Sequence, residues 1–476
     1  MRDAFWVDDP DAASTARTGL PVVVIGAGPV GLAAAAHLLA RGLEPLVLEA
    51  GSQIGANIAQ WRHVRLFSPW CQTLDPVSVR LLDGAGWAAP DLDALPTGSA
   101  LLDRYLEPLA AVPVLADRIR LQTRVVAVAR RGLDKVRKPG RDRLPFVVRV
   151  RDADRRLRDL QARAVIDASG TWTQPNPLGA SGLPALGEAG AAPRVTYGLP
   201  DILNRDRSRF AERRVVVVGA GHSAATSLLA LAELQTKAPA TQIVWAVRSA
   251  TPRPLVGKGS AEADELPARG RLATDLAALV NAGRIDLIAG FRIAGVELAG
   301  DRVGLHGDQV LGKDHADVRD RCVEADQVIA ATGFRPDHSI ARELRLALEP
   351  ALESASALGP VIDPNVHTCG TVPAHGIAEL AHPEPGYVIV GMKSYGRAPT
   401  FLLATGYQQI RSAVAALAGD RAGATRRDQG PPAATMCATN RALSVRTRAR
   451  RPRTSVVTAT PPAGTAADWS AASCCP

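Results

Sequence analysis

PVVVIGAGPVG, residues 21–31, decides the fold of this chain. Its run of valines and isoleucine suits a parallel strand that is buried on both faces. Gly26 predicts a tight turn, and Gly28 leaves no side chain between the backbone and a pyrophosphate. Gly31 allows the helix that begins at Pro29 to pack closely on the strand, with its positive N-terminus at the phosphates. The stretch predicts a dinucleotide-binding unit, rather than a glycine-rich turn without a ligand.

The residues after this unit are those expected of a ribose site. The helix should end near Arg41, and a second strand should follow over residues 45–48. Glu49 comes next, 18 residues after Gly31, where an acidic side chain accepts hydrogen bonds from the hydroxyls of an adenosine ribose.

A second stretch, RVVVVGAGHSA at residues 214–224, repeats the pattern. Its turn and helix start contain Gly219, Gly221, His222, Ser223 and Ala224. Alanine in place of the third glycine still permits close packing of helix on strand. The chain therefore contains two predicted dinucleotide sites.

The two predicted sites differ in the residue that ends their second strand. The strand at residues 242–247 is followed by Arg248, where the first site has Glu49. An arginine suits a ribose 2′-phosphate, which an acid would repel. The pattern favours a non-phosphorylated adenosine in the first site and NADPH in the second. The alternative is that Arg248 is only a solvated charge at a strand end.

Two further segments each place an apolar strand before a turn of small residues. They are ARAVIDASGTW at residues 162–172 and ADQVIAATGFRPD at residues 325–337. In their order along the chain, the four motifs resemble those of the flavin-dependent monooxygenases and their disulfide-reductase relatives. The resemblance covers residues 21–419 and implies an FAD domain interrupted by an NAD(P)H domain, with the small-residue turns at the crossings.

The resemblance implies an α/β fold with two Rossmann-like domains. The FAD domain would comprise residues 1–204 and 335–419, the NADPH domain residues 205–334, and residues 420–476 would form a disordered basic tail. The hinges are expected at residues 173–193 and 334–337.

The cofactors FAD and NADPH are assigned to residues of these motifs and of a later apolar strand. The expected cofactor-binding residues are Gly26, Ala27, Gly28, Pro29, Gly31, Glu49, Val125, Gly170, Gly219, Gly221, His222, Ser223, Ala224, Arg248, Thr332, Gly333, Gly391 and Met392. Four residues near the last flavin contact are candidates for orienting a substrate: His367, Lys393, Tyr395 and Arg397. Ordinary loop packing is the alternative for these four.

The resemblance implies that NADPH reduces the flavin, which then captures O2 as a C4a-peroxide and oxygenates a small soft nucleophile at sulfur, nitrogen or a metalloid. Two motifs of the monooxygenases are weakened here. In the first, no histidine follows Tyr197 and Gly198 before His222. In the second, the tryptophan expected soon after Glu49 is represented only by Trp61, which comes later. No catalytic residue is assigned.

Six cysteines are present, and none forms the CxxC or CxxxxC pair of disulfide reductases, which disfavours thioredoxin- or glutathione-type reduction. The adjacent Cys474 and Cys475 resemble the C-terminal thiol pair of mercuric reductases. One alternative function is therefore an NADPH-flavin reductase that passes electrons to a thiol-bound metal or metalloid. Another is a redox-sensing flavoprotein without substrate turnover. No other metal site is predicted.

The charge of the chain is concentrated at its C-terminal end. The net charge is +9, of which residues 421–476 supply +7 through nine arginines and two acids. A solvated tail explains this better than nucleic-acid binding. The apolar residues 22–40 contain glycines and Pro29, which argues against a membrane span, and no secretory signal is visible. We expect a cytoplasmic enzyme with a small-molecule substrate and O2 as partners, no nucleic-acid or membrane partner, and a homo-oligomer as an open alternative.

Overall fold

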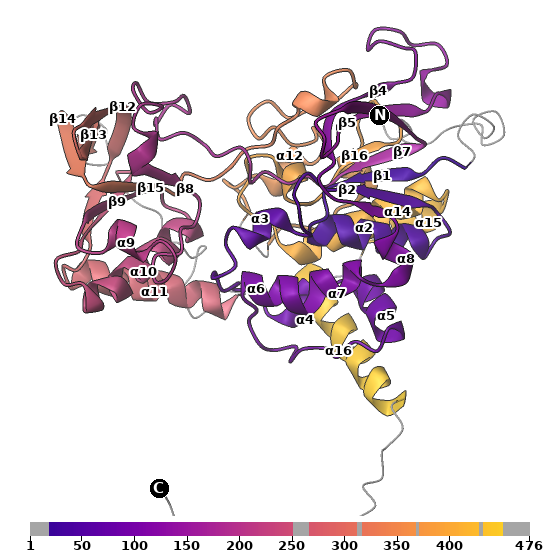
Figure 1. The fold of residues 1–476 in the computed structure, drawn as a ribbon, viewed down its shortest axis with the longest axis horizontal. Coiled ribbons are helices and arrows are strands. Elements are labelled where there is room, and N and C mark those ends of the chain that lie inside the picture. The colour runs from indigo at the N-terminus through magenta and orange to yellow at the C-terminus, as the bar shows by residue number, and fades with distance from the viewer. Residues whose placement is uncertain (1–18, 251–265, 312–316, 368–370, 428–431, 451–476) are drawn as a thin grey trace, which may run out of the picture.

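The computed structural model describes residues 19–250, 266–311, 317–367, 371–427 and 432–450. Figure 1 shows two lobes, each built around a parallel sheet, with stretches of chain crossing between them. The first lobe contains both ends of the described chain, and the second is inserted between its parts. This is the interrupted arrangement that the order of motifs predicts.

The first lobe is built on a five-stranded parallel sheet in the order β16-β7-β1-β2-β3. The strands are β16 Tyr387–Ile389, β7 Ala164–Asp167, β1 Val22–Ile25, β2 Pro45–Leu48 and β3 Ile119–Arg120. Alternate residues of β1 face opposite sides, as the period of a strand requires. Val22 and Val24 pack toward the helices, whereas Val23 and Ile25 pack toward an antiparallel sheet. The predicted burial of β1 on both faces is confirmed.

Two layers cover this sheet. On one side α2 (Pro29–Leu39) lies against α5 (Pro76–Gly84) and α14 (Leu403–Leu417). On the other side lies a three-stranded antiparallel sheet of β4 Arg124–Arg130, β5 Phe146–Arg151 and β6 Leu157–Ala162. The sequence reasoning did not predict this antiparallel layer.

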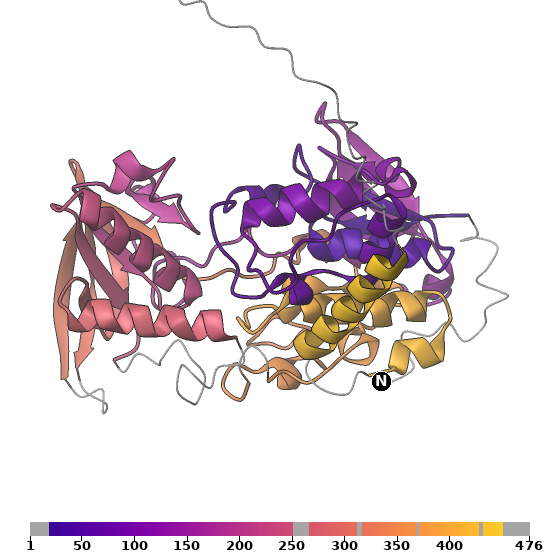
Figure 2. The same ribbon diagram turned by 90° about the horizontal axis from the view of Figure 1, so that it is seen from below.

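The second lobe repeats the plan with a sheet in the order β11-β10-β9-β15-β8. The strands are β11 Asp286–Ala289, β10 Gln242–Val247, β9 Arg214–Val218, β15 Gln327–Ala330 and β8 Val195–Tyr197. Helices α10 (His222–Lys237) and α11 (Pro267–Asn281) pack against each other and cover one face (Figure 2). An antiparallel sheet of β12 Phe291–Ala299, β13 Arg302–Leu311 and β14 Asp317–Ala325 covers the other face.

Short helices fill the connections. They are α3 Ala56–Ala59, α4 Trp70–Thr73, α6 Gly98–Leu101, α7 Glu107–Ala110, α8 Pro113–Ala116, α9 Arg207–Phe210, α12 Gly359–Ile362, α13 Ile377–Leu380 and α15 Arg421–Thr425. Within the described residues, no helix has the length and apolar character needed to cross a bilayer.

The structure corrects the predicted domain boundary at residues 204 and 205. Strand β8 pairs with β15 in the second sheet, so the second lobe begins before Val195.

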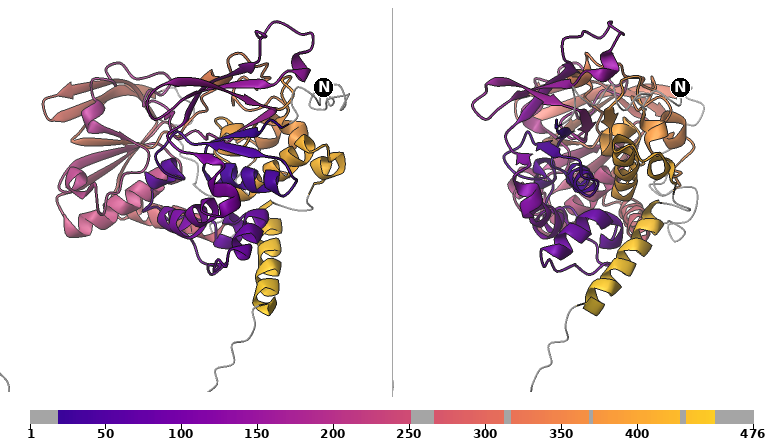
Figure 3. Two further views of the ribbon diagram at one scale, coloured as in Figure 1. Left: turned by 45° about the vertical axis from the view of Figure 1, so that its right-hand side comes forward. Right: turned by 90° about the vertical axis from the view of Figure 1, so that its right-hand side faces the viewer.

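The structure also corrects the prediction that the whole tail from residue 420 is disordered. Helix α16 (Pro432–Arg450) packs against α4, α5 and α14, and its C-terminal end projects from the first lobe (Figure 3). Cys437 forms a disulfide with Cys71 of α4, and Asn440 is buried. These contacts are made to residues more than 300 positions away, which the composition of the tail does not reveal.

Candidate functional site: two facing dinucleotide folds

The first glycine turn is closed so tightly that side chains are excluded from it. Gly26 has φ +100°, and a Cβ there would lie 2.8 Å from the carbonyl oxygen of Ala168. A Cβ on Gly31 would lie 1.9 Å from the carbonyl oxygen of Gly26. At Gly28, by contrast, a Cβ would meet nothing within 4 Å, and α2 begins there without a side-chain cap. Open space at an uncapped helix N-terminus fits a pyrophosphate.

Glu49 is held beside this turn. One carboxylate oxygen accepts the backbone N–H of Ala27 at 2.8 Å, and the other accepts that of Gly51 at 2.7 Å. A carboxylate oxygen can accept two hydrogen bonds, so each oxygen retains a lone pair for a ribose hydroxyl. The position fits the predicted ribose contact.

A buried ion pair lies behind the small-residue turn that contains Gly170. The Lys393 Nζ atom is 2.7 Å from Oδ2 of Asp167 and 3.1 Å from Oγ of Ser169. The Tyr387 hydroxyl donates to the same Asp167 oxygen at 2.9 Å. Burial alone would raise the pKa of Asp167, but the Lys393 charge and the hydrogen bonds outweigh it and hold this pKa below its ordinary value. The pair fixes the end of β7 to the loop after β16.

Lys393 and Tyr395, two of the candidates for orienting a substrate, are buried, which favours the alternative of loop packing for both. Lys393 is 2% exposed and Tyr395 is fully buried, with its ring against Phe401. Of the cluster, Arg397 is more exposed and lies 3.8 Å from a Glu353 carboxylate oxygen.

The loop after β16 approaches the first glycine turn through Gly391. This residue has φ +69°, and a Cβ there would lie 3.3 Å from Val30 on α2. Its N–H donates to Oε1 of Gln409 at 2.8 Å. The Gln409 amide group in turn donates to Nε2 of His375 at 3.0 Å and to Ser394 Oγ at 2.9 Å. Gly391 is thus held near the start of α2, and the contact of Gly391 and Met392 with the flavin stays a prediction.

His375 must be neutral to accept that bond. Its Nδ1 lies 3.0 Å from the carbonyl oxygen of Pro373 and donates to it, which leaves Nε2 as the acceptor. Burial lowers the pKa of His375, which favours this neutral form.

The second glycine turn has the same geometry. Gly219 has φ +131°, and a Cβ there would lie 2.2 Å from the carbonyl oxygen of Ala331. A Cβ at Gly221 would meet nothing within 4 Å, and α10 begins at His222 without a side-chain cap. The ring of His222 lies 5.2 Å from the ring of Phe67 in the first lobe. Ser223 follows in the first turn, and Ala224 is fully buried against the sheet.

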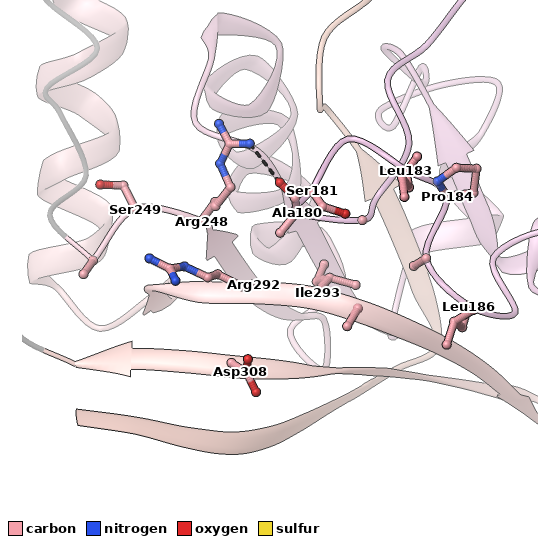
Figure 4. Close-up of a pocket in the computed structure, with 14 residues that line it drawn as sticks. Ala180, Ser181, Leu183, Pro184, Leu186, Arg248, Ser249, Arg292, Ile293 and Asp308 are labelled. Atoms are coloured by element: carbon pink, nitrogen blue, oxygen red, sulfur yellow. Dashed lines mark hydrogen bonds between the residues drawn. The ribbon is translucent and has the colours of Figure 1, made fainter. Parts of the chain in front are cut away.

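Arg248 lines a pocket of about 840 Å3 at the carboxyl end of β10. Its Nη1 donates to the carbonyl oxygen of Ala180 at 3.1 Å, and Arg292 of β12 lies on the same side of the pocket (Figure 4). Asp308 pairs in register with Arg292 and is the carboxylate in the lining. Apolar walls come from Leu183, Leu186 and Ile293. Two guanidinium groups beside an apolar wall suit a phosphorylated adenosine.

Hydrogen bonds join the two stretches of chain that cross between the lobes, which we call the first and second crossing. Asn176 lies in the first crossing, and its backbone carbonyl oxygen accepts a hydrogen bond from the Thr332 hydroxyl. The side-chain amide of Asn176 donates to the carbonyl oxygen of Thr332 at 3.1 Å. Its backbone N–H donates to the carbonyl oxygen of Gly333 at 2.9 Å. Thr332 and Gly333 therefore hold the hinge, and their contacts in the structure are to the other crossing.

Aromatic rings gather beside this hinge. Trp172 stacks on Phe334 at 4.6 Å between centroids, and Trp61 of the first lobe is 6.4 Å from Trp172. The Trp172 indole N–H donates to Oε1 of Gln60 at 2.9 Å. Trp61 is thus part of the contact between the lobes. The sequence indicated it only as a motif residue that lies later than expected.

Four candidates remain. Val125 of β4 is buried in the core with Val23 and Val148. His367 lies in a turn, where its backbone N–H donates to the carbonyl oxygen of Asp363. Cys474 and Cys475 lie outside the described residues. The described part of the chain contains no group of three or more His, Cys, Asp or Glu residues arranged to hold a metal ion.

Sequence reasoning missed Asp167, Gln409, Asn176 and Arg292. Asp167 lies within the motif at residues 162–172. An acid at the end of a buried strand signals a partner of opposite charge, because a buried charge without one is costly. The other three are defined by contacts over long sequence separations, for which the sequence had no signal.

Comparisons with known proteins agree with this architecture. Residues 21–139 match the family model described as FAD dependent oxidoreductase. No curated protein matches the chain in sequence. Residues 21–139 are therefore similar to an FAD-dependent oxidoreductase domain, and the predicted FAD cofactor is confirmed.

Solved structures similar to the chain are two-domain flavoproteins. Bacillithiol disulfide reductase Bdr from Bacillus cereus is 19% identical, with a TM-score of 0.58 over 88% of this chain and 99% of that chain. The ornithine N-hydroxylase from Kutzneria sp. 744 is 17% identical, with a TM-score of 0.55 over 85% and 99%. A flavin monooxygenase from Stenotrophomonas maltophilia is 22% identical, with a TM-score of 0.53 over 84% and 98%. These matches confirm the predicted fold of two Rossmann-like domains.

Proposed function

We propose that this chain is an NADPH-dependent flavin monooxygenase that oxygenates a small soft nucleophile at sulfur, nitrogen or a metalloid. When bound, FAD would accept hydride from NADPH and supply the electrons that reduce O2. The protein would bind both cofactors, orient them and exclude water.

The contact between His222 and Phe67 carries the proposal. His222 is the first residue of α10, so a diphosphate bound at this helix N-terminus would lie on the face of the second lobe that meets the first lobe. The first glycine turn and Gly391 belong to that first lobe. A nucleotide in each site would thus extend toward the same junction.

The cysteines favour oxygen over a dithiol as the electron acceptor. Among the described cysteines, Cys71 and Cys437 are joined to each other, and the free thiol is that of Cys322. Cys322 is exposed on β14, in the antiparallel sheet of the second lobe. Flavoproteins that reduce disulfides commonly use two cysteines close together in the sequence, whereas Cys71 and Cys437 are 366 residues apart.

The aromatic cluster at the junction supports a reaction that must exclude water. Trp61, Trp172 and Phe334 bring apolar area to the point where the lobes meet. A reduced flavin that has reacted with oxygen is protected from wasteful peroxide release only in a dry site. We assign to these rings the exclusion of water.

Arg248 and Arg292 would select NADPH over NADH. Both line the pocket at the carboxyl end of the second sheet, where nucleotides bind in this class of fold. The Asp308 carboxylate beside Arg292 offsets part of the positive charge of the pocket. This lowers the attraction of the pocket for anions in general.

A reductase of thiol-bound metal or metalloid is a second candidate. The docking of α16 favours it, because this helix anchors the chain 24 residues before Cys474. Truncation after Arg450 separates the two: it would abolish the reductase activity and leave oxygenation unchanged.

The balance between oxygen consumed and hydrogen peroxide released tests the primary proposal. Thioanisole, 1,5-diaminopentane and arsenite represent sulfur, nitrogen and metalloid nucleophiles. With the correct class, NADPH oxidation should accelerate or stay constant while peroxide release falls. Complete peroxide release with every probe would refute monooxygenation of these classes.

A further inference from the structure

We propose that Cys71 and Cys437 form a reversible thiol-disulfide switch that controls the docking of α16 and, through it, the junction between the lobes. The cysteines are 366 residues apart in the chain, and their Cα atoms lie 4.4 Å apart. Cys71 is 1% exposed, whereas Cys437 is partly exposed. An external thiol can therefore approach the disulfide from the side of Cys437.

Hydrogen bonds, an exposed ion pair and apolar packing accompany the disulfide in the docking of α16. Asn440 donates from its amide group to the carbonyl oxygens of Cys71 and Leu74, both at 2.9 Å. Leu443 packs against the main core, and Arg441 forms an exposed ion pair with Asp93. The side chains between these residues are mostly short or polar, so apolar burial contributes little to docking. The disulfide adds a covalent link between α16 and the lobe.

One turn before Cys437, the same helix reaches the junction. Ala433 packs against a small cluster formed by Leu402 of the first lobe and Leu266 of the second, which Phe67 also joins. Residues four apart lie on one face of a helix, so fixing Cys437 on α4 directs Ala433 to this cluster. Phe67 is the residue that contacts His222 at the second glycine turn. The disulfide thus stabilises a helix that contacts both lobes.

The switch exchanges electrons with small thiols. A thiolate attacks Sγ of Cys437, the sulfur-sulfur bond breaks, and Cys71 leaves as a thiolate that takes up a proton. A second small thiol attacks the mixed disulfide and releases Cys437. Two external thiols become one external disulfide, and the two cysteines gain two electrons and two protons. Disulfides in reducing compartments are usually of this transient, redox-sensing kind.

Thiol labelling of the full chain tests the bond itself. In the oxidised chain, purified without reductant, alkylation and peptide mass spectrometry should find Cys71 and Cys437 unlabelled and joined to each other, and both labelled after dithiothreitol. Cys322, which is exposed, should be labelled in both samples and serves as the internal control. Labelling of Cys71 and Cys437 in the oxidised sample would overturn the proposal.

Limited trypsin digestion tests the release of α16. Cleavage after Arg441 should be faster by about tenfold or more in the reduced chain, because proteolysis follows the population of the undocked helix. Cys437→Ser should give the fast rate with or without reductant, and Cys322→Ser should behave as the unmodified chain. Equal rates in the oxidised and reduced chain would show that the disulfide does not hold α16 and would overturn the proposal.

The effect on the junction rests on the proposed function but is measured separately. Reduction of the disulfide should change the rate of flavin reduction by NADPH under anaerobic conditions, and Cys322→Ser should not alter that response. Failure of NADPH to reduce the flavin in either state would contradict the proposed function, whereas equal rates in both states would contradict coupling of the switch to the junction.

Discussion

The side chains of Asp167 and Lys393 form a buried ion pair, with 2.7 Å between Oδ2 and Nζ. The aspartate ends β7 immediately before the turn of Ser169 and Gly170, and the lysine lies in the loop after β16. The pair therefore joins two segments of the first site that are 226 residues apart in the chain. It positions backbone that would contact FAD, without reaching a substrate itself.

Loss of Lys393 should destabilise the protein strongly. Lys393→Met leaves the Asp167 carboxylate buried without its counter-charge, which costs about 3–5 kcal/mol of unfolding free energy. The double variant with Asp167→Asn should recover part of this loss, because it removes the unpaired charge. Urea unfolding of both variants measures the effect. A loss below about 1 kcal/mol in the single variant, as for an exposed pair, would contradict the account.

His382 should make stability depend on pH between about 4 and 6.5. Burial lowers the pKa of His382 to about 4 in the folded chain, whereas the unfolded chain binds a proton near the ordinary value of 6.5. The unfolded state therefore binds more protons in this window, and stability falls as pH falls. His382→Asn can keep an acceptor for the Ala347 N–H and should remove this contribution.

Urea unfolding at pH 7 and pH 5 measures the change. The loss of unfolding free energy between the two pH values should be smaller in His382→Asn by about 2 kcal/mol. His306→Asn, at an exposed position on β13, should leave the loss unchanged. An equal loss in the His382 variant and the unmodified chain would show that His382 titrates alike in both states.

The two arginines of the second site should share the recognition of the 2′-phosphate. Arg248→Ala and Arg292→Ala should each weaken binding of 2′,5′-ADP by about 10- to 100-fold, because each removes a charge-assisted hydrogen bond. Binding of 5′-AMP, which lacks the 2′-phosphate, should hardly change. Calorimetry of both ligands measures this, with Arg302→Ala on β13 as the exposed control. Equal weakening of both ligands would contradict the assignment.

Glu49 should contribute to FAD affinity. Glu49→Gln places an amide donor against one of the N–H groups of Ala27 and Gly51, so the side chain turns away from the ribose. We expect FAD binding to weaken by about tenfold or more, measured by flavin fluorescence on dilution. Glu44→Gln, at the exposed pair with Arg118, is the matched control. Unchanged affinity in the Glu49 variant would remove Glu49 from the ribose site.

The elements that the sequence predicted well are those with local causes. The strands β1, β2 and β10 follow from short apolar runs, and the glycine turns follow from backbone conformations that few other residues adopt. Both dinucleotide folds could be predicted for this reason. The boundaries of the motifs were accurate to a few residues.

The elements that it missed depend on distant partners. The composition around Cys437 suggested disorder, but the disulfide to Cys71 and the amide bonds of Asn440 stabilise a helix there. The ion pair of Lys393 was not predicted, because its partner Asp167 lies 226 residues earlier. Arg292 contributes to the pocket only because β12 follows β11 at the carboxyl edge of the second sheet.

Incorporation of labelled oxygen tests the central claim most directly. The chain loaded with FAD is reduced by NADPH and mixed with 18O2 in the presence of thioanisole, 1,5-diaminopentane or arsenite, and the product is analysed by mass spectrometry. A monooxygenase should place one 18O atom in the product from one of these nucleophiles and consume an equal amount of NADPH. Flavin reoxidation with all the label in hydrogen peroxide, for all three probes, would contradict this claim.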